Sequence, residues 1–285
     1  MSVTFGVKTQ YGFEQCAAEP FQYPGGEWDL KNITPSTGTF VANVRGADAN
    51  DLAKAMVFAQ LARETHNPFV LLLPYLPAAR SDRSMDGRPM GASAYGRWIN
   101  SMGAEQVITI DPHSTWAKDC YHFCTSLSLA PLVRKALEGH HLYHYVVAPD
   151  EGASKRAHEV ADNLDLPVIH CTKHRDTSTG KIEGLSVPDD LDPLNVGRLA
   201  NYLVVDDICD GGRTFAELAR QLKLPKEQLG LWVTHGIFSG NSRLLREHYS
   251  QIFTTNSHPG HNNLFVKATI IPVEPYLWDA IKEFE

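Results

Sequence analysis

The chain has 285 residues, 43% hydrophobic and 21% charged, which is the composition of a globular protein with one large domain or two of ordinary size. Its net charge of −7 gives no global electrostatic case for nucleic acid, so a phosphate site would have to be a local basic cluster. With no apolar run long enough for a membrane span, no signal segment and five scattered cysteines, we expect a cytoplasmic protein with reduced thiols.

Short apolar runs alternate with helical patterns along the chain, which predicts an α/β fold with mainly parallel sheets flanked by helices. We expect strands at residues 69–74, 106–111, 143–149, 167–170, 203–206 and 229–235. We expect helices at residues 48–66, 92–102, 129–137, 154–164, 215–222 and 242–248, and an exposed loop at 183–195. The distribution predicts two α/β domains, 1–143 and 144–272, with a C-terminal helix within 273–285 that packs back on the first domain.

A charged loop follows the first expected strand, with Arg80 and Arg83 on either side of Asp82. Arginine forks suit polyphosphates, although a solvated charged loop would have the same composition. The second expected strand delivers Asp111 and His113 to its tip, where taken alone an ordinary hydrogen-bonded loop histidine is the favoured interpretation of His113.

Asp150 ends the 143–149 strand before a glycine-containing turn. Its carboxylate could reach a magnesium ion through water or cap the helix that follows. Cys120, His122 and Cys124 suggest a metal site by type alone, but no second ligand pair has zinc-site spacing, so core or loop positions are favoured.

Lys173 and Arg175 lie just after the 167–170 strand, ahead of a polar, glycine-containing stretch. A loop here could bring both cations onto a transferring phosphoryl group, where compensation of developing charge is most of the catalytic task. A solvated basic turn is the alternative. His235, at the end of the 229–235 strand, is interpreted as a satisfied loop histidine.

The segment 202–215 carries the most specific pattern. Asp206 and Asp207 end an apolar strand, and a Gly-Gly pair and Thr214 precede a helical run. Backbone N–H groups of such a turn and of a helix N-terminus hold phosphate, and the two carboxylates can face the hydroxyls of an attached sugar. The segment therefore predicts a binding loop for a ribose 5-phosphate unit, with an ordinary strand–turn–helix as the alternative.

In their order, these segments resemble the phosphoribosyl pyrophosphate synthetase (ribose-phosphate diphosphokinase) family, from about residue 23 to 257. Residues 79–83 are similar to its ATP-binding Ala-Arg-Gln-Asp-Arg, with Ser81 in place of Gln. The 111–113 segment is similar to its Asp-Leu-His, Asp150 to its metal-facing Asp, and Lys173 to Arg175 to its catalytic Lys-Arg-Arg.

Further segments carry the same resemblance. Residues 23–27 resemble the family's Phe-Ser-Asp-Gly-Glu loop, which touches adenine from a neighbouring subunit, although Gly25 replaces the Asp. Residues 234–235, 239–240 and 255–257 match other family signatures. The family's first helix, ahead of the Glu27 loop, is largely missing from this sequence.

The resemblance implies two tandem type I phosphoribosyltransferase-like domains and a homo-oligomer, dimer or hexamer. It implies transfer of the β,γ-diphosphate of ATP to the anomeric hydroxyl of ribose 5-phosphate, with release of AMP and with Mg²⁺ as cofactor. Lys173 and Arg175 would be catalytic, and His113 and Asp150 would organise the metal. ATP binding is implied for Arg80, Asp82, Arg83, His113, Tyr23 and Glu27, and ribose-phosphate binding for Asp206, Asp207, Asp210, Gly211, Gly212, Arg213 and Thr214.

One departure bears on the acceptor, because the family loop Asp-Thr-Ala-Gly-Thr is here Asp210-Gly-Gly-Arg-Thr214. A more open turn with an added cation would accommodate a 5′-diphosphate, so ADP-ribose, which points to NAD metabolism, is nearly as favoured as ribose 5-phosphate. Two other functions remain open. A phosphoribosyltransferase shares only the 206–214 loop, and a non-catalytic regulatory homologue would be expected to lose residues such as Lys173.

Overall fold

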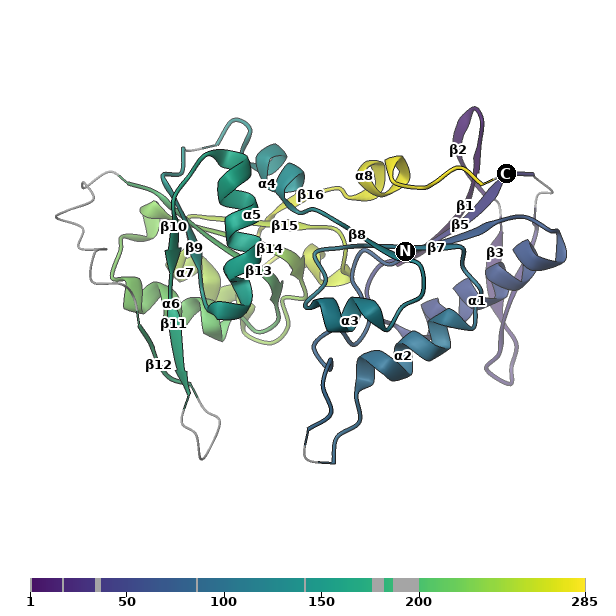
Figure 1. Ribbon diagram of the computed structural model, residues 1–285, viewed down its shortest axis with the longest axis horizontal. Helices are drawn as coiled ribbons and strands as arrows, with labels where there is room; N and C mark the ends of the chain where they lie inside the picture. Colours follow the sequence, from purple (N-terminus) through teal and green to yellow (C-terminus); the bar gives the residue numbers. More distant parts are fainter. Residues whose placement is uncertain are drawn as a thin grey trace. The chain divides into compact units, whose positions relative to one another are not determined.

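The computed structural model describes residues 2–16, 18–33, 37–85, 87–140, 142–175, 182–186 and 200–284, with backbone only at 172–175 and 182–186 (Figure 1). The chain divides into two compact units. Unit 1 consists of Met1–Leu127, Ser257–Pro259 and Val273–Glu285, and unit 2 of Ser128–Asn256 and Gly260–Pro272. Each unit is built around a six-stranded sheet.

The sheet of unit 1 has the strand order β2-β1-β5-β6-β7-β8. Its strands are β1 (Val3–Thr9), β2 (Gly12–Gln15), β5 (Thr39–Val44), β6 (Phe69–Leu72), β7 (Gln106–Ile110) and β8 (Cys124–Leu127). β5 to β8 are parallel, whereas β1 is antiparallel to both β2 and β5. A separate hairpin joins β3 (Glu19–Gln22) to β4 (Trp28–Lys31). The helices are α1 (Ala49–Glu64), α2 (Gly91–Asn100), α3 (Thr115–Asp119) and α8 (Glu274–Asp279).

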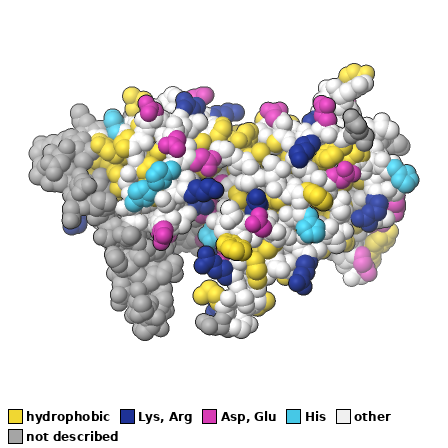
Figure 2. Space-filling view, in the orientation of Figure 1, with side chains coloured by type: hydrophobic (Ala, Val, Ile, Leu, Met, Phe, Trp, Pro, Cys, Tyr) yellow, Lys and Arg dark blue, Asp and Glu magenta, His cyan; other side chains and the backbone are white. Residues whose placement is uncertain are grey.

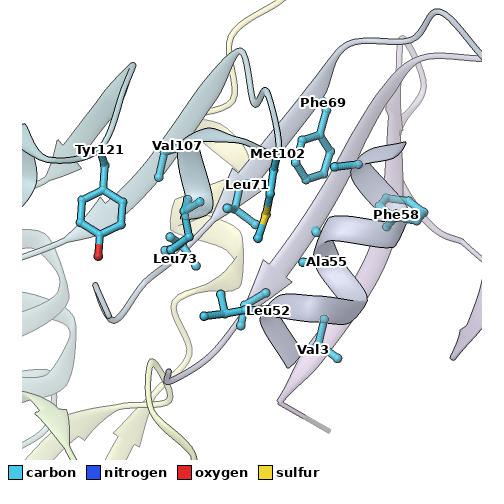
Figure 3. Close-up of a cluster of buried hydrophobic side chains, with 14 of the residues drawn as sticks. Val3, Leu52, Ala55, Phe58, Phe69, Leu71, Leu73, Met102, Val107 and Tyr121 are labelled. Carbon is cyan, nitrogen blue, oxygen red and sulfur yellow. The ribbon is translucent and has the colours of Figure 1, made fainter. Parts of the chain in front are cut away.

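The core of unit 1 forms where α1 packs on the sheet. Asp48 starts this helix, because its side chain accepts hydrogen bonds from the N–H groups of Asn50 and Asp51. The ring of Phe58 then stacks on Phe5, with 4.5 Å between centroids. Figure 3 shows the α1 side chains with those of the strands in this cluster. Burial of complete apolar runs such as β6 is typical of parallel sheets covered on both faces.

The sheet of unit 2 is parallel throughout, in the order β10-β9-β13-β14-β15-β16. Its strands are β9 (Tyr145–Ala148), β10 (Val168–His170), β13 (Tyr202–Cys209), β14 (Leu229–Gly236), β15 (Gln251–Thr255) and β16 (Thr269–Ile271). The helices are α4 (Ala130–Leu137), α5 (Ser154–Leu164), α6 (Arg213–Leu222) and α7 (Leu245–His248). Short 3₁₀ turns are η1 (Glu151–Ala153), η3 (Lys226–Gln228), η4 (Ser242–Leu244) and η5 (Pro259–Asn262). A two-stranded ribbon pairs β11 (Thr172–Arg175) with β12 (Ile182–Ser186).

The expected fold class is confirmed: both units are α/β, with mainly parallel sheets flanked by helices. The sequence missed β1 to β5, β8, β15 and β16, and residues 183–186 lie in β12 rather than in a loop. The rest of the expected 183–195 loop is outside the described residues. Across the part of the chain that the structure describes, no helix is long and apolar enough to span a bilayer.

The C-terminal helix is shorter than the sequence suggested, because α8 ends at Asp279. Polar side chains of the unit 1 sheet form hydrogen bonds with the backbone of residues 280–282, which follow the helix. Gln106 donates through Nε2 to the carbonyl of Ala280 at 3.2 Å and accepts from the N–H of Lys282 at 3.0 Å. Lys8 donates to the carbonyl of Ile281 at 2.7 Å. These bonds tie the backbone of residues 280–282 to the sheet of unit 1 after the helix has ended.

Candidate active site

Asp206 and Asp207 lie within β13, which continues to Cys209 rather than ending at 206 as the apolar pattern predicted. The strand extends because it keeps pairing with β14, with Asp206 opposite Val233 and Ile208 opposite His235. The Asp207 residue is only 4% exposed, and the Asp206 side chain is 16% exposed. Two adjacent carboxylates therefore lie in the interior of unit 2, where charge is costly unless it is paired.

The partner of both acids is Arg156, a residue to which the sequence analysis gave no role. Its Nη1 lies 3.3 Å from Oδ1 of Asp206, and its Nη2 lies 3.5 Å from Oδ2 of Asp207. The same Nη1 donates to the carbonyl of Gly152 at 3.1 Å. A sequence signal did exist: Arg156 follows Ala153 by three residues and precedes Val160 by four, which places it on the buried face of α5. A cation on a core face predicts a buried anion nearby.

The surroundings of Asp206 disfavour the charged form of its carboxyl group. Burial raises its pKa well above the ordinary value, and the negative charge of Asp207 raises it further. Arg156 acts in the opposite direction, and Asp150 adds a smaller upward shift. The backbone N–H of Asp207 also donates to Oδ1 of Asp206 at 2.9 Å. Perturbed acids of this kind cluster at functional sites.

The turn from β13 into α6 contains two glycines in different situations. Gly212 has φ +79°, and a Cβ there would lie 3.0 Å from Cγ of Leu245, so the position requires glycine. At Gly211 a Cβ would meet nothing within 4 Å. Arg213 is the first residue of α6 and is exposed, and Thr214 follows it half-buried.

The loop after β14 forms hydrogen bonds with Cys209 and Asp210, the residues that lead into the glycine turn. The N–H of Ile237 donates to the carbonyl of Cys209 at 2.9 Å, and the N–H of Ser239 donates to the carbonyl of Asp210 at 3.1 Å. The Ser239 hydroxyl also donates to the Asp210 carboxylate. A glycine turn that opens a helix of ten residues presents N–H groups suited to an anion.

Asp150 caps the short η1 turn in front of α5, and its carboxylate accepts from the N–H of Ala153 at 3.2 Å. Both alternatives considered for this acid are compatible with that position. Because its charge raises the pKa of Asp206, it belongs to the same electrostatic neighbourhood. Within the described residues no group of three or more His, Cys, Asp or Glu side chains forms a metal site.

Lys173 and Arg175 lie on a strand and not in the loop that the sequence suggested. β11 pairs antiparallel with β12, with Lys173 opposite Leu185 and Arg175 opposite Ile182. The pattern was misleading because polar and basic residues occur in two-stranded ribbons as well as in loops. β11 follows β10 after a single residue, Cys171.

In unit 1, Asp82 connects the loop that carries Arg80 and Arg83 to the loop that carries His113. Its Oδ2 accepts from the hydroxyl of Ser114 at 2.6 Å, and Ser114 Oγ caps α3 by accepting from the N–H of Ala117 at 3.1 Å. Asp82 lies 4.0 Å from the Nε of Arg83, whose side chain is 74% exposed. Arg80 and His113 are exposed as well, so cations and an imidazole project from these loops.

Ser81, the residue that departs from the family motif, has a structural role in unit 1. Its hydroxyl oxygen accepts from the N–H of Gly91 at 3.0 Å, and its carbonyl accepts from the N–H of Ala92 at 3.0 Å. These bonds satisfy two N–H groups at the start of α2. Asp111 ends β7 in a left-handed conformation, φ +42°, and is buried.

Tyr23 and Glu27 form the tip of the hairpin between β3 and β4. The N–H of Tyr23 donates to the carbonyl of Glu27 at 2.9 Å, and both residues are exposed. The Tyr23 hydroxyl donates to Asp29 at 3.2 Å, which raises the pKa of the phenol. The tip therefore projects an aromatic ring and a carboxylate.

The structure brings Asp150, Asp206 and Asp207 together with the glycine turn in unit 2, and Arg80, Asp82, Arg83 and His113 together in unit 1. His235, at the end of β14, is buried, and the hydroxyl of Thr255 donates to the carbonyl of Thr234 at 2.6 Å. On the face shown in Figure 2, the Lys and Arg side chains of the described residues are interspersed with Asp and Glu and form no continuous basic band.

Comparison with known proteins finds sequence similarity to ribose-phosphate pyrophosphokinases from several organisms. The ribose-phosphate pyrophosphokinase of Hyphomonas neptunium is 28% identical over 261 residues, which are 84% of this chain and 82% of that protein. The protein of the same name from Aquifex aeolicus is 29% identical over 235 residues, 78% of this chain and 72% of that protein. No protein-family model matches the chain.

A solved structure extends this similarity to the fold. The crystal structure of phosphoribosylpyrophosphate synthetase from Mycobacterium smegmatis has a TM-score of 0.75 to this chain at 20% identity. The match covers 93% of this chain and 89% of that one. Both units therefore have counterparts within a single known architecture.

Proposed function

Because the chain belongs to the ribose-phosphate pyrophosphokinase family of diphosphate-transferring enzymes, we propose that it transfers the β,γ-diphosphate of ATP to the anomeric 1-hydroxyl of a ribose 5-phosphate unit. The hydroxyl oxygen attacks the β-phosphorus, the bond between the α,β-bridging oxygen and that phosphorus breaks, AMP leaves and the hydroxyl proton passes to solvent. The observation that carries the proposal is the buried pair Asp206–Asp207 beside the glycine turn that opens α6.

The acceptor side lies in unit 2. Asp206 and Asp207 would accept hydrogen bonds from the ribose hydroxyls, which charged carboxylates do more strongly than neutral groups. The N–H groups from Gly211 to Thr214 would hold the 5′-phosphate at the positive end of the α6 dipole. The Asp210 carboxylate, which accepts from Ser239, keeps that turn in register with the β14 loop.

The donor side uses the loops of unit 1. Arg80 and Arg83 would bind the ATP phosphates, and Asp82 orders their loop through Ser114. His113, next to the Ser114 that bonds Asp82, would contact the same ligand. Tyr23 and Glu27 would contact adenine from the hairpin tip, which in a homo-oligomer could serve a neighbouring subunit.

Magnesium suits the donor chemistry of these residues. In unit 2 the carboxylates of Asp150, Asp206 and Asp207 outnumber the guanidinium of Arg156, and oxygen-rich, negatively charged surroundings favour a hard divalent cation. Asp150 in unit 2 and His113 in unit 1 would each be a candidate ligand of Mg²⁺, which generally binds through few protein ligands together with substrate phosphates. When bound, the metal supplies charge neutralisation on the diphosphate.

Lys173 and Arg175 on β11 would stabilise the charge that develops on the transferring group. A phosphoryl-transfer transition state is stabilised mainly by positioning and by fixed positive charge, because the protein contributes little covalent chemistry. Placing both cations on a paired strand supports a defined geometry better than a loop would.

ADP-ribose is a second candidate acceptor, and the glycine turn favours it. Gly211 has neither a left-handed φ nor a neighbour within 4 Å, so the backbone does not require glycine there. Its absent side chain leaves room beside the phosphate site, and Arg213 adds an exposed cation. Both features suit a 5′-diphosphate that continues beyond the phosphate site, as it does in ADP-ribose. An ADP-ribose acceptor would connect the protein to NAD metabolism.

An acceptor comparison tests the proposal. The protein is incubated with ATP and Mg²⁺ plus ribose 5-phosphate or ADP-ribose, and AMP and product mass are followed. We expect AMP in equal amount to a 1-pyrophosphorylated product, and loss of at least about a hundredfold in kcat in Lys173→Ala with folding intact. Preference for one acceptor identifies the substrate. Absence of AMP with both would refute the transfer, and full activity of the Lys173 variant would refute the role of β11.

A further inference from the structure

Arg156 reaches the two acids of the proposed acceptor site from α5, an element outside the strand and turn that carry them. One nitrogen of its guanidinium contacts Asp206 at 3.3 Å and the other contacts Asp207 at 3.5 Å. The residue is 8% exposed, so it is as deeply buried as the carboxylates. A third contact, 3.1 Å to the carbonyl of Gly152, fixes the guanidinium to the turn that follows Asp150.

A planar guanidinium fixes the relative orientation of two carboxylates better than an ammonium group does. Its five N–H donors lie in one rigid plane, so two carboxylates that meet it at different nitrogens are held in a fixed relative orientation. Successive side chains on a strand point to opposite faces, and the N–H of Asp207, which donates to Oδ1 of Asp206, orients the Asp206 carboxylate without fixing the alignment of both acids. Arg156 supplies that alignment.

The positive charge of Arg156 also favours the charged form of Asp206. Burial and the adjacent Asp207 favour the neutral form of Asp206, whereas Arg156 favours the carboxylate. A carboxylate accepts hydrogen bonds from two neighbouring hydroxyls more strongly than a protonated acid does. The contacts of Arg156 thus support both the orientation and the charge that a sugar diol requires.

We propose that Arg156 is a positioning residue for the sugar acceptor, holding Asp206 and Asp207 in the arrangement that receives the ribose hydroxyls. The inference rests on the proposed function and adds to it a residue that acts through the two acids. We expect Arg156 to affect acceptor binding more than nucleotide binding, because it contacts both acids that would hold the sugar.

The decisive variant is Arg156→Lys, which keeps the positive charge inside unit 2 but lacks the rigid fork that meets the two carboxylates at separate nitrogens. Arg156→Gln removes the charge as well. Arg220→Gln is the matched control, because Arg220 is an exposed α6 residue whose guanidinium pairs with Glu217 of the same helix at 3.2 Å. For each protein, KM for the acceptor, KM for ATP, kcat and the thermal midpoint are measured, and ribose 5-phosphate and ADP-ribose are titrated calorimetrically without ATP.

We expect Arg156→Lys to raise the acceptor KM about tenfold or more while KM for ATP stays within about twofold, since one charge-assisted hydrogen bond is worth about a factor of ten. Arg156→Gln should lose acceptor binding in calorimetry, and Arg220→Gln should match the wild type. An unchanged acceptor KM in folded Arg156→Lys would overturn the proposal, as would a parallel rise of both KM values with a lowered thermal midpoint. If the wild type releases no AMP, diphosphate transfer has failed, and calorimetry alone still decides the role of Arg156.

Discussion

The two glycines between β13 and α6 differ in what a methyl group would do to them. Gly212 needs a left-handed backbone and already lies against Leu245, whereas Gly211 faces open space. We expect Gly212→Ala to destabilise the protein by about 1–3 kcal/mol and to weaken acceptor binding, because both strain and a close contact are introduced. Gly211→Ala should leave the free energy of unfolding within about 0.5 kcal/mol.

Denaturant unfolding of the two variants side by side measures this difference. Each serves as the control for the other, since both add one methyl group to the same turn. Equal destabilisation at the two positions would contradict the assignment of open space to Gly211.

Asp206 carries an electrostatic cost that a neutral residue would remove. Its pKa is raised in the folded protein, so the folded state binds this proton more tightly than the unfolded state does. Stability therefore falls as pH rises from the unfolded pKa, about 3.9, toward the raised folded value, and the loss is complete above it. Asp206→Asn avoids this loss at neutral pH.

We expect Asp206→Asn to unfold at least about 3 °C higher than the wild type at pH 7.5, with the difference shrinking toward pH 4. The same variant should lose acceptor binding, since the amide cannot replace the charge. Calorimetric scans across this pH range measure the effect, with the exposed α5 acid variant Asp162→Asn as control. A stability difference that does not depend on pH would argue against a strained carboxylate.

At the scale of elements, Ser114 couples two loops of unit 1. It caps α3 and donates to Asp82, so the loop that carries Arg80 and Arg83 is tied to the loop that carries His113. We expect Ser114→Ala to cost about 1 kcal/mol of stability and to raise KM for ATP several-fold, with the acceptor KM unchanged. Ser101→Ala is the control, because that hydroxyl bonds only locally to the carbonyl of Trp98.

Steady-state kinetics with each substrate varied in turn checks this prediction. A Ser114 variant whose two KM values both equal those of the wild type would show that the loops are ordered without this contact.

The parallel strands β6, β7, β9, β10, β13 and β14 could be predicted because burial on two faces favours continuous apolar runs, as in β6 and β14, whereas the parallel strands β5, β8, β15 and β16 were missed. The antiparallel β2 and the β3–β4 hairpin gave no such signal, since their side chains are largely exposed. Within the site, the strand–turn–helix around Asp206 followed from its local pattern. Arg156 did not, because its role depends on a contact 50 residues distant in the chain.

The order of segments in unit 1 constrains how the protein forms during synthesis. Its last part, Val273–Glu285, follows the whole of unit 2 along the chain, and it contributes the buried side chains of Leu277 and Ile281. An emerging chain therefore holds unit 1 with a gap in its core while unit 2 is being made. Loop-closure entropy grows only slowly with length, so the late segment can still join cheaply. The first unit to start folding on the ribosome is thus the last to be finished.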